Sequence, residues 1–256
     1  MSTDATSATT LAAFRVACRD CSLEQLCLPV GIGEADLEML DKIVKRRRPI
    51  QRGEHLFRIG DAFRCFYAVR SGSIKSYTLV EDGREQVTGF HLPGELIGLD
   101  AIAATRHHCA AKALEVASVC EIPFDHFEQL AEKLPSLPRQ MLRIMSREIA
   151  QEQAQITQLG QKSGEERLAA FLLSLSERFR LRGFSANEFN LSMSRIEIGN
   201  YLGLAEETVC RLFTRFEEIG VLSVDRKYVQ IHNLAQLKQL SSPVLVARHP
   251  RTKSAS

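Results

Sequence analysis

The sequence predicts an α+β protein in which an N-terminal antiparallel β-roll is joined by one long helix to a C-terminal winged helix-turn-helix domain. Three patterns support this prediction. Short alternating apolar stretches separated by turn residues fill residues 50–124. A stretch rich in helix formers follows, without glycine or proline between Pro138 and Gly160. Two short helical patterns around a glycine, and then a hairpin pattern, complete the chain.

Composition places the chain among ordinary globular proteins. With 256 residues, of which 45% are hydrophobic and 25% charged, it has room for two modest domains. The 33 basic and 31 acidic residues nearly cancel, so a nucleic-acid partner has to be argued from a local face. No apolar run reaches the roughly 18–20 residues of a membrane helix, and the polar first ten residues lack a signal-peptide pattern. We therefore expect a soluble, cytoplasmic protein with no membrane partner.

The β-roll is expected over residues 29–136. Its clearest strand patterns alternate apolar and polar side chains. They cover residues 55–57, 66–69, 74–79 and 86–91. Turns that contain glycine, such as Ser71-Gly72 and Pro93-Gly94, separate the patterns and supply positions for positive φ. We predict a small antiparallel barrel or roll of about eight strands.

Residues 137–160 are predicted to form one long helix. Apolar residues recur on it at alternating spacings of three and four, which is the heptad pattern of a two-stranded coiled coil. This dimerisation seam consists of Leu142, Met145, Ile149, Glu152, Ile156 and Leu159. The alternative is that the stripe packs the helix on its own roll. Glu152 favours a homodimer, because a carboxylate in a monomer core needs a partner, whereas in a parallel two-fold dimer it faces its own copy and makes association conditional.

The predicted C-terminal domain covers residues 161–241. A helical pattern through residues 168–179 ends before Gly183, and residues 194–213 read as helix, turn and helix, with Gly203 permitting the bend. Two apolar runs, at residues 221–224 and 228–231, predict the hairpin of a wing. The polar, basic tail at residues 242–256 is expected to be disordered.

The second helix of this motif carries the candidate DNA contacts. Glu207, Cys210 and Arg211 are three and four residues apart, so they share one face near its N-terminus. Arg211 can bind guanine O6 and N7, and Glu207 can accept from cytosine N4. The same predicted set includes Thr208, and Arg215 as a phosphate contact. The alternative is that Glu207 and Arg211 form only an exposed ion pair. In a dimer, two copies would bind a pseudo-palindromic site on double-stranded DNA.

Four cysteines are candidate metal ligands. Cys18, Cys21 and Cys27 crowd the N-terminal segment 1–28, with two and five intervening residues, and Cys120 lies far downstream. Seven cysteines without a secretion signal argue for ligation or redox chemistry over a disulfide framework. Zinc favours paired Cys-x-x-Cys units, whereas a four-thiolate iron-sulfur cluster tolerates this dispersed spacing better, and neither is excluded. We expect Cys65 and Cys109 to pack, or to sit at turns, as small apolar residues, and His107-His108 to form a loop without a site.

These features together resemble a known family. The chain is similar to the oxygen-sensing fumarate-nitrate reduction (FNR, also ANR) branch of the cyclic AMP receptor and FNR superfamily of transcription factors, from Cys18 to about Leu240. The four candidate cysteines match the cluster ligands of that branch, as does Gly199-Asn200-Tyr201-Leu202-Gly203-Leu204 in the helix-turn-helix. Cys210 departs from the pattern, because the branch usually has serine there. The thiol is a weaker hydrogen-bonding group, so discrimination at one A·T pair is expected to be relaxed.

The resemblance implies an oxygen-responsive transcription regulator that controls genes for anaerobic metabolism and acts as an activator. A [4Fe-4S] cluster would form on Cys18, Cys21, Cys27 and Cys120 without oxygen, favour the homodimer and permit binding to TTGAT-N4-ATCAA-like sites; oxygen would convert it to [2Fe-2S] and release the dimer. RNA polymerase would contact residues 71–72, 81–84 and 182–185. Cyclic nucleotide binding is not expected, because residues 108–112 lack the Arg-Ser phosphate clamp of the cyclic AMP branch.

Two other classes of protein stay open from the residues alone. One is an iron-sulfur electron-transfer protein, which would cycle between redox states without losing its cluster. The other is a zinc-stabilised DNA-binding regulator, whose binding would be indifferent to oxygen. No nucleophile elbow, phosphate loop or telling histidine arrangement is found, so the chain is not expected to be an enzyme.

Overall fold

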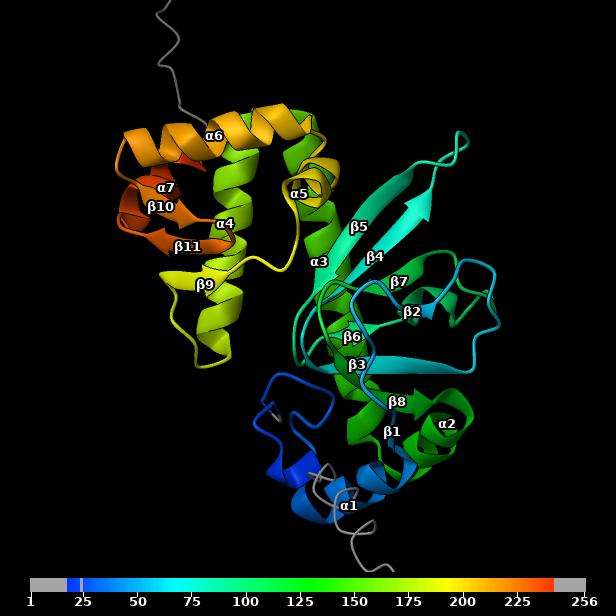
Figure 1. Cartoon of the computed structure of the whole chain (residues 1–256). Helices are drawn as coiled ribbons and strands as arrows, with labels where there is room; N and C mark the ends of the chain where they lie inside the picture. The colour runs from blue at the N-terminus through cyan, green and yellow to red at the C-terminus, as the bar shows by residue number, and fades with distance from the viewer. Residues whose placement is uncertain (1–17, 24, 242–256) are drawn as a thin grey trace, which may run out of the picture.

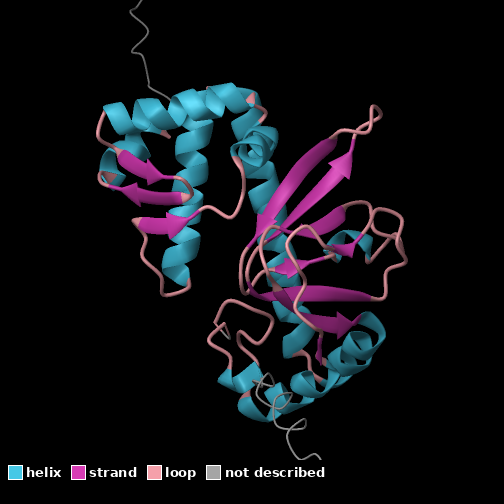
Figure 2. Cartoon of the chain, viewed as in Figure 1, coloured by secondary structure: helices cyan, strands magenta, loops and turns pink. Residues whose placement is uncertain are grey.

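The computed structural model describes residues 18–23 and 25–241, and its architecture confirms the predicted α+β fold. The predicted disordered tail at residues 242–256 lies outside the described residues, as does most of the N-terminal segment. Figure 2 shows a β-rich half and a helix-rich half, connected by a long helix. No helix within the described ranges is both long and apolar enough to cross a membrane.

Eight strands form the β-roll as two four-stranded antiparallel sheets, in the orders β1-β8-β3-β6 and β2-β7-β4-β5. The strands are β1 (Lys45–Arg46), β2 (His55–Phe57), β3 (Cys65–Ser71), β4 (Ile74–Leu79), β5 (Glu85–His91), β6 (Leu96–Ile97), β7 (Ala110–Ala113) and β8 (Ser118–Pro123). A short 3-10 helix, η3 (Leu99–Ala101), follows β6. The inward residues of the two sheets, among them Tyr67, Val69, Ile74 and Ala111, meet in one apolar core.

Two helices and the start of a third close one end of the roll. They are α1 (Glu34–Ile43), α2 (Phe124–Lys133) and α3 (Ser136–Gln161). Leu40, Leu130 and Leu137 from these helices pack against Phe66 and Ile122 of the roll. This second core lies beside the segment that carries the three N-terminal cysteines, because Cys18, Cys27 and Cys120 pack against it.

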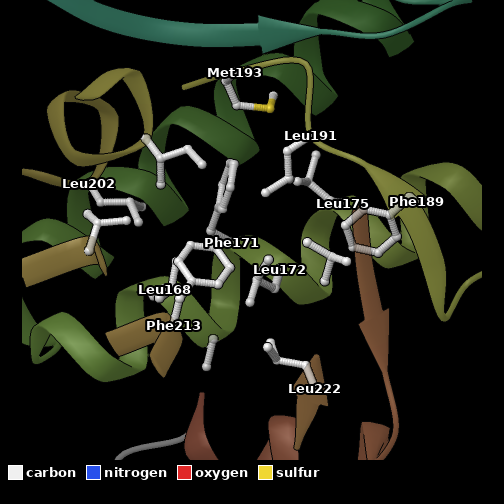
Figure 3. Close-up of a cluster of buried hydrophobic side chains, with 14 of the residues drawn as sticks. Leu168, Phe171, Leu172, Leu175, Phe189, Leu191, Met193, Leu202, Phe213 and Leu222 are labelled. Atoms are coloured by element: carbon white, nitrogen blue, oxygen red, sulfur yellow. The ribbon is translucent and has the colours of Figure 1, made fainter. Parts of the chain in front are cut away.

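The C-terminal half is a winged helix-turn-helix. It consists of α4 (Gly164–Leu181), β9 (Glu188–Asn190), α5 (Arg195–Leu202), α6 (Glu206–Glu218), β10 (Leu222–Asp225), β11 (Tyr228–Ile231) and α7 (Leu234–Leu240). Capping boxes at Ser163 with Glu166, and at Ser194 with Glu197, fix the starts of α4 and α5. Leucine and phenylalanine side chains from α4, α5, α6 and the wing fill the core of this half (Figure 3). The sequence predicted the hairpin of the wing but not β9, its third strand.

The two halves are not separate bodies. Val87, Phe90, Leu92 and Leu114 of the roll belong to the same buried cluster as the core of the C-terminal half. Helix α5 contacts β5, and Figure 1 shows the β4–β5 hairpin beside the helix-turn-helix, with α3 running between the halves. The position of the C-terminal half is therefore set by packing on the roll as well as by the α3 connection.

Candidate metal and DNA-binding sites

The fold brings the four candidate cysteines to one pocket. Cys18 begins the short 3-10 helix η2 (Cys18–Asp20), and the backbone N–H of Cys27 donates to Leu23 at 3.0 Å, so this segment folds back on itself. Cys120 lies on β8, opposite Arg46 of β1 and Ala68 of β3. Cys18, Cys21, Cys27 and Cys120 all line the same pocket, whose remaining wall is mostly apolar.

The chemistry of this donor set suits a thiophilic metal or an iron-sulfur cluster. All four cysteines are free, and burial raises the pKa of both Cys18 and Cys27 to about 12. Burial also raises the pKa of Cys120. A bound centre with positive charge is what would stabilise thiolates in such a place. Within the part of the chain that the structure describes, no three His, Cys, Asp or Glu side chains are arranged as a ready-made metal site.

A carboxylate holds the first of these cysteines in position. Asp41 of α1 accepts a hydrogen bond from the backbone N–H of Cys18 at 3.0 Å and pairs with Arg46 of β1 at 2.6 Å. Burial acts to raise the pKa of Asp41, but the hydrogen bonds from Arg46 and Cys18 lower it overall. No local pattern indicates a role for Asp41, because its two partners, Cys18 and Arg46, are 23 and 5 residues away.

The candidate reading face of α6 is exposed on the part of the chain that the structure describes. Glu207, Cys210 and Arg211 are exposed, and Thr208 is half-buried at the same end of the helix. Gly203 adopts φ +64° between α5 and α6, and a Cβ on Gly199 would lie 2.6 Å from the Leu204 carbonyl oxygen. Glycine at these two positions therefore permits the close turn that presents α6.

Two arginines form contacts between the reading helix α6 and its neighbours. Arg215 of α6, predicted as a phosphate contact, pairs with Glu165 of α4 at 3.1 Å, and its side chain is still 60% exposed. The guanidinium of Arg195, at the start of α5, lies 3.5 Å from the centre of the Phe213 ring. Arg195 was not among the predicted site residues, because the stacking depends on how α5 and α6 cross.

The predicted dimerisation seam is largely uncovered in the single chain. Leu142, Ile149 and Ile156 are 66%, 53% and 69% exposed, and Glu152 is exposed beside them. The remaining seam residues are Met145, which is half-buried, and Leu159, which is 36% exposed. Leu137, Met141 and Ile144 of α3 are buried and pack on the roll instead. Most of the stripe therefore does not pack the helix on its own roll, which was the alternative interpretation.

The region of the roll around residues 108–112, which lacks the Arg-Ser phosphate clamp, is occupied by the protein's own side chains. His107 is buried and stacks on Phe57 at 3.8 Å between ring centres, and the Asp100 carboxylate accepts the backbone N–H groups of His108 and Cys109. His107 lies in a loop, as expected, and the structure adds that its ring packs in the core. Cys65 is buried, as expected, and Cys109 is half-buried.

The residues predicted to meet RNA polymerase differ in exposure. The turn at residues 81–84 is exposed, and so is Phe184. The side chain of Arg182 is only 3% exposed, because it turns inward to pair with Glu95 at 2.6 Å. Arg182 itself is therefore not part of an outer surface.

Both halves of the chain match known protein families. Residues 47–133 match the family model of the cyclic nucleotide-binding domain, and residues 166–240 match the Crp-like helix-turn-helix domain. The Fumarate and nitrate reduction regulatory protein of Escherichia coli (strain K12) is 52% identical over 88% of this chain and 90% of its own length. The Transcriptional activator protein Anr of Pseudomonas protegens is 54% identical over 88% and 92%.

Among solved structures, the chain is similar to FixK2 from Bradyrhizobium japonicum. The similarity covers 78% of this chain and 98% of FixK2, with a TM-score of 0.72 and 29% identity. A cyclic nucleotide binding protein from Ruegeria pomeroyi, described as putative, shares the fold at a TM-score of 0.63 and 24% identity. The arrangement of roll, long helix and winged helix is thus one that related proteins adopt.

Proposed function

Because this chain belongs to the FNR/Anr branch of the Crp/FNR family of transcription regulators, and is by that kinship an anaerobic regulator, we propose that it senses oxygen through a [4Fe-4S] cluster. Cys18, Cys21, Cys27 and Cys120 would hold the cluster, which when bound supplies oxygen-sensitive iron-sulfur chemistry. The observation that carries the proposal is the meeting of these four free thiols at one mostly apolar pocket, although Cys120 is 93 or more residues distant in sequence.

The rest of the chain supports a switch that acts through association. Cys120 lies on β8, which leads through α2 to α3, the helix with the exposed seam. We propose that the cluster-loaded protein forms a homodimer along Leu142, Met145, Ile149, Glu152, Ile156 and Leu159, and that oxygen releases it. Two reading helices would then bind TTGAT-N4-ATCAA-like DNA through Glu207, Thr208, Cys210 and Arg211, with Arg215 near phosphate. Contact with RNA polymerase at residues 81–84 belongs to the same proposal.

We do not propose a cyclic nucleotide as effector. Asp100 already accepts the backbone N–H groups of His108 and Cys109, and its negative charge would repel a cyclic phosphate there. His107 in the same stretch is buried and stacks on Phe57, so it is not free to act as a phosphate ligand.

One experiment tests the main proposal. The protein purified without oxygen is expected to be coloured, to contain iron and sulfide in near-equal amounts, and to bind its DNA site until air is admitted. Cys120→Ala should lose most of the iron, whereas Cys65→Ala removes a buried cysteine outside the pocket and should keep it.

The two alternatives give different results in the same experiment. A zinc-stabilised regulator would be colourless, contain zinc and bind DNA equally before and after air. An iron-sulfur electron-transfer protein would be coloured and cycle between redox states, with a DNA affinity that does not depend on the cluster. Either result would overturn the proposal.

A further inference from the structure

The turn from Leu92 to Glu95, between β5 and β6, lies against the cysteine segment. Gly94 has φ +91°, and a Cβ built on it would lie 2.8 Å from the Cβ of Leu26, the residue next to Cys27. Only glycine leaves room for Leu26 at this distance, so the segment that holds three candidate ligands is seated directly on the turn.

The same turn is also tied to the wall of the cysteine pocket. The backbone N–H of Gly94 donates to the Val69 carbonyl at 2.8 Å, and the N–H of Val69 donates to the Glu95 carbonyl at 2.9 Å. Val69 lines the pocket, and its neighbour Ala68 is opposite Cys120 in the sheet. The turn therefore contacts the surroundings of the pocket at two places, at Leu26 and at β3.

On its other side the turn holds the DNA-binding half. The Glu95 carboxylate accepts from Arg178 Nε at 3.0 Å and from Arg182 Nη2 at 2.6 Å, and both arginines belong to the C-terminal end of α4 or follow it directly. Arg178 also donates to the Phe90 carbonyl, and Arg182 to the Pro93 carbonyl at 2.6 Å. Burial acts to raise the pKa of Glu95, but the Arg178 and Arg182 charges lower it overall, so this carboxylate is ionised.

We propose that the Leu92–Glu95 turn connects the cysteine segment to the DNA-binding half within one subunit, so that the position of Leu26 helps to set the orientation of α4. This inference rests on the proposed function for the identity of the sensor and of the DNA site. It adds a second route to the one through dimerisation, because none of Leu26, Glu95, Arg178 and Arg182 belongs to the α3 seam. The contacts are ion pairs between half-buried residues with fixed hydrogen-bond partners, and a network of this kind can have two discrete arrangements.

A double-mutant cycle tests the connection. Four proteins are purified without oxygen: the parent, Leu26→Ala, Glu95→Gln and the double variant. Their DNA affinities are compared at equal iron content and equal dimer fraction. Each single change is expected to weaken DNA binding by about fivefold to tenfold. The double variant should bind DNA no more weakly than the single variant with the lower affinity, because both changes break the same series of contacts.

Matched controls separate this path from general damage. Leu23→Ala makes the same chemical change elsewhere in the cysteine segment, and its effect should add to that of Glu95→Gln. Arg180→Gln removes an arginine of α4 that pairs with Glu177 on the surface, and it should leave DNA affinity unchanged. If Glu95→Gln does not fold, Arg182→Lys takes its place, since it keeps the charge and loses the fork that reaches Glu95 and Pro93 together.

The outcomes are distinct. Full additivity of Leu26→Ala with Glu95→Gln, or unchanged DNA affinity in both single variants, overturns the connection. If the parent does not hold iron, or does not bind DNA in an oxygen-dependent way, the proposed function is overturned instead. Measurements on the parent alone decide this.

Discussion

Glu148 is a glutamate whose surroundings shift its pKa strongly upward. It lies half-buried on α3, where it faces Glu95 of the β5–β6 turn, Arg178 of α4 and Glu152 on its own helix. Burial, and after it the Glu95 charge, raises the pKa of Glu148 to about 7. Because folding raises the pKa of Glu148, the folded state favours the protonated carboxyl. The ionised carboxylate therefore lowers the stability of the fold, and this loss grows as pH rises from the pKa of the unfolded chain toward 7.

We expect Glu148→Gln to stabilise the protein above pH 7 and to have little effect near pH 4.5. The gain should be on the order of 2 kcal/mol, since solvent reduces the full value of a shift of this size at a half-buried group. Thermal unfolding of the parent and the variant between pH 4.5 and 8 measures it. Glu128→Gln, on the exposed face of α2, is the control with no expected change. A constant difference across this range would contradict the role given to Glu148.

Cys210 is the residue at which the candidate DNA contacts depart from the branch pattern. It is exposed on α6, so its side chain is free to approach a base. We expect Cys210→Ser to sharpen discrimination at one A·T position of the half-site by about threefold to tenfold, because a hydroxyl is the better hydrogen-bonding group. Competition binding with single-base variants of the site measures this. Discrimination at the G·C pair assigned to Glu207 and Arg211 should not change, and an identical profile at every position would count against the assignment.

At the scale of the element, α3 divides its surface between two tasks. One face packs on the roll, and the other exposes Leu142, Ile149 and Ile156 with Glu152 among them. An exposed apolar stripe at heptad spacing is typical of a helix that pairs with a second copy. The acid in the stripe would weaken that pairing, since two like charges would face each other across a two-fold axis.

We expect Glu152→Ala to strengthen dimerisation of the aerobic, cluster-free protein by tenfold or more, because it removes this repulsion and adds apolar contact; a tenfold change is about 1.4 kcal/mol. Sedimentation velocity over a range of concentrations measures the dissociation constant. If the cluster-free variant stays as monomeric as the parent, Glu152 does not control association.

Ile156→Lys provides the opposite change on the same seam. It should abolish the anaerobic dimer and leave the thermal stability of the monomer nearly unchanged, since Ile156 is 69% exposed. Ala154→Lys places the same charge on the exposed surface outside the seam, and it should leave the dimer intact.

At the scale of the whole molecule, the roll and the DNA-binding half share one apolar cluster. The ring of Phe90 on β5 lies 5.0 Å from that of Tyr201 on α5 and 6.0 Å from that of Phe171 on α4, measured between centres. Asn200 adds polar contacts, because its side-chain amide donates to Glu85 and accepts from the N–H of Val87. Lys75 of the roll pairs with both Glu85 and Glu197. A shared core of this kind predicts that the two halves unfold together.

We expect Phe90→Ala to cost about 3–5 kcal/mol and to separate a single calorimetric transition into two, because it opens a cavity between the halves. Phe184→Ala is the matched control, since Phe184 is 62% exposed, and it should leave the profile unchanged. A parent protein that already unfolds in two independent steps would contradict the coupling.

Local patterns were sufficient for most of the elements and for the family. Strand alternation predicted β2, β3, β4 and β5, and the run of helix formers predicted α3 nearly to its ends. The spacing of Cys18, Cys21 and Cys27 is visible in one short segment. The short strand β9 was missed, since only pairing with β11 makes it a strand. The helices α1, α2 and α7 were also not predicted.

The amino-acid sequence by itself therefore determined the strands β2 to β5, the long helix α3, the reading helix α6 with its wing and the kinds of residue available for a metal, because those depend on periodicity and spacing within a few turns. Only the tertiary structure decided which distant groups meet. It brought Cys120 to the N-terminal cysteines through the pairing of β8 with β1 and β3, and it turned Arg182 inward to Glu95, 87 residues away. Such contacts follow from strand order and from the packing of the two halves, and no local pattern encodes either.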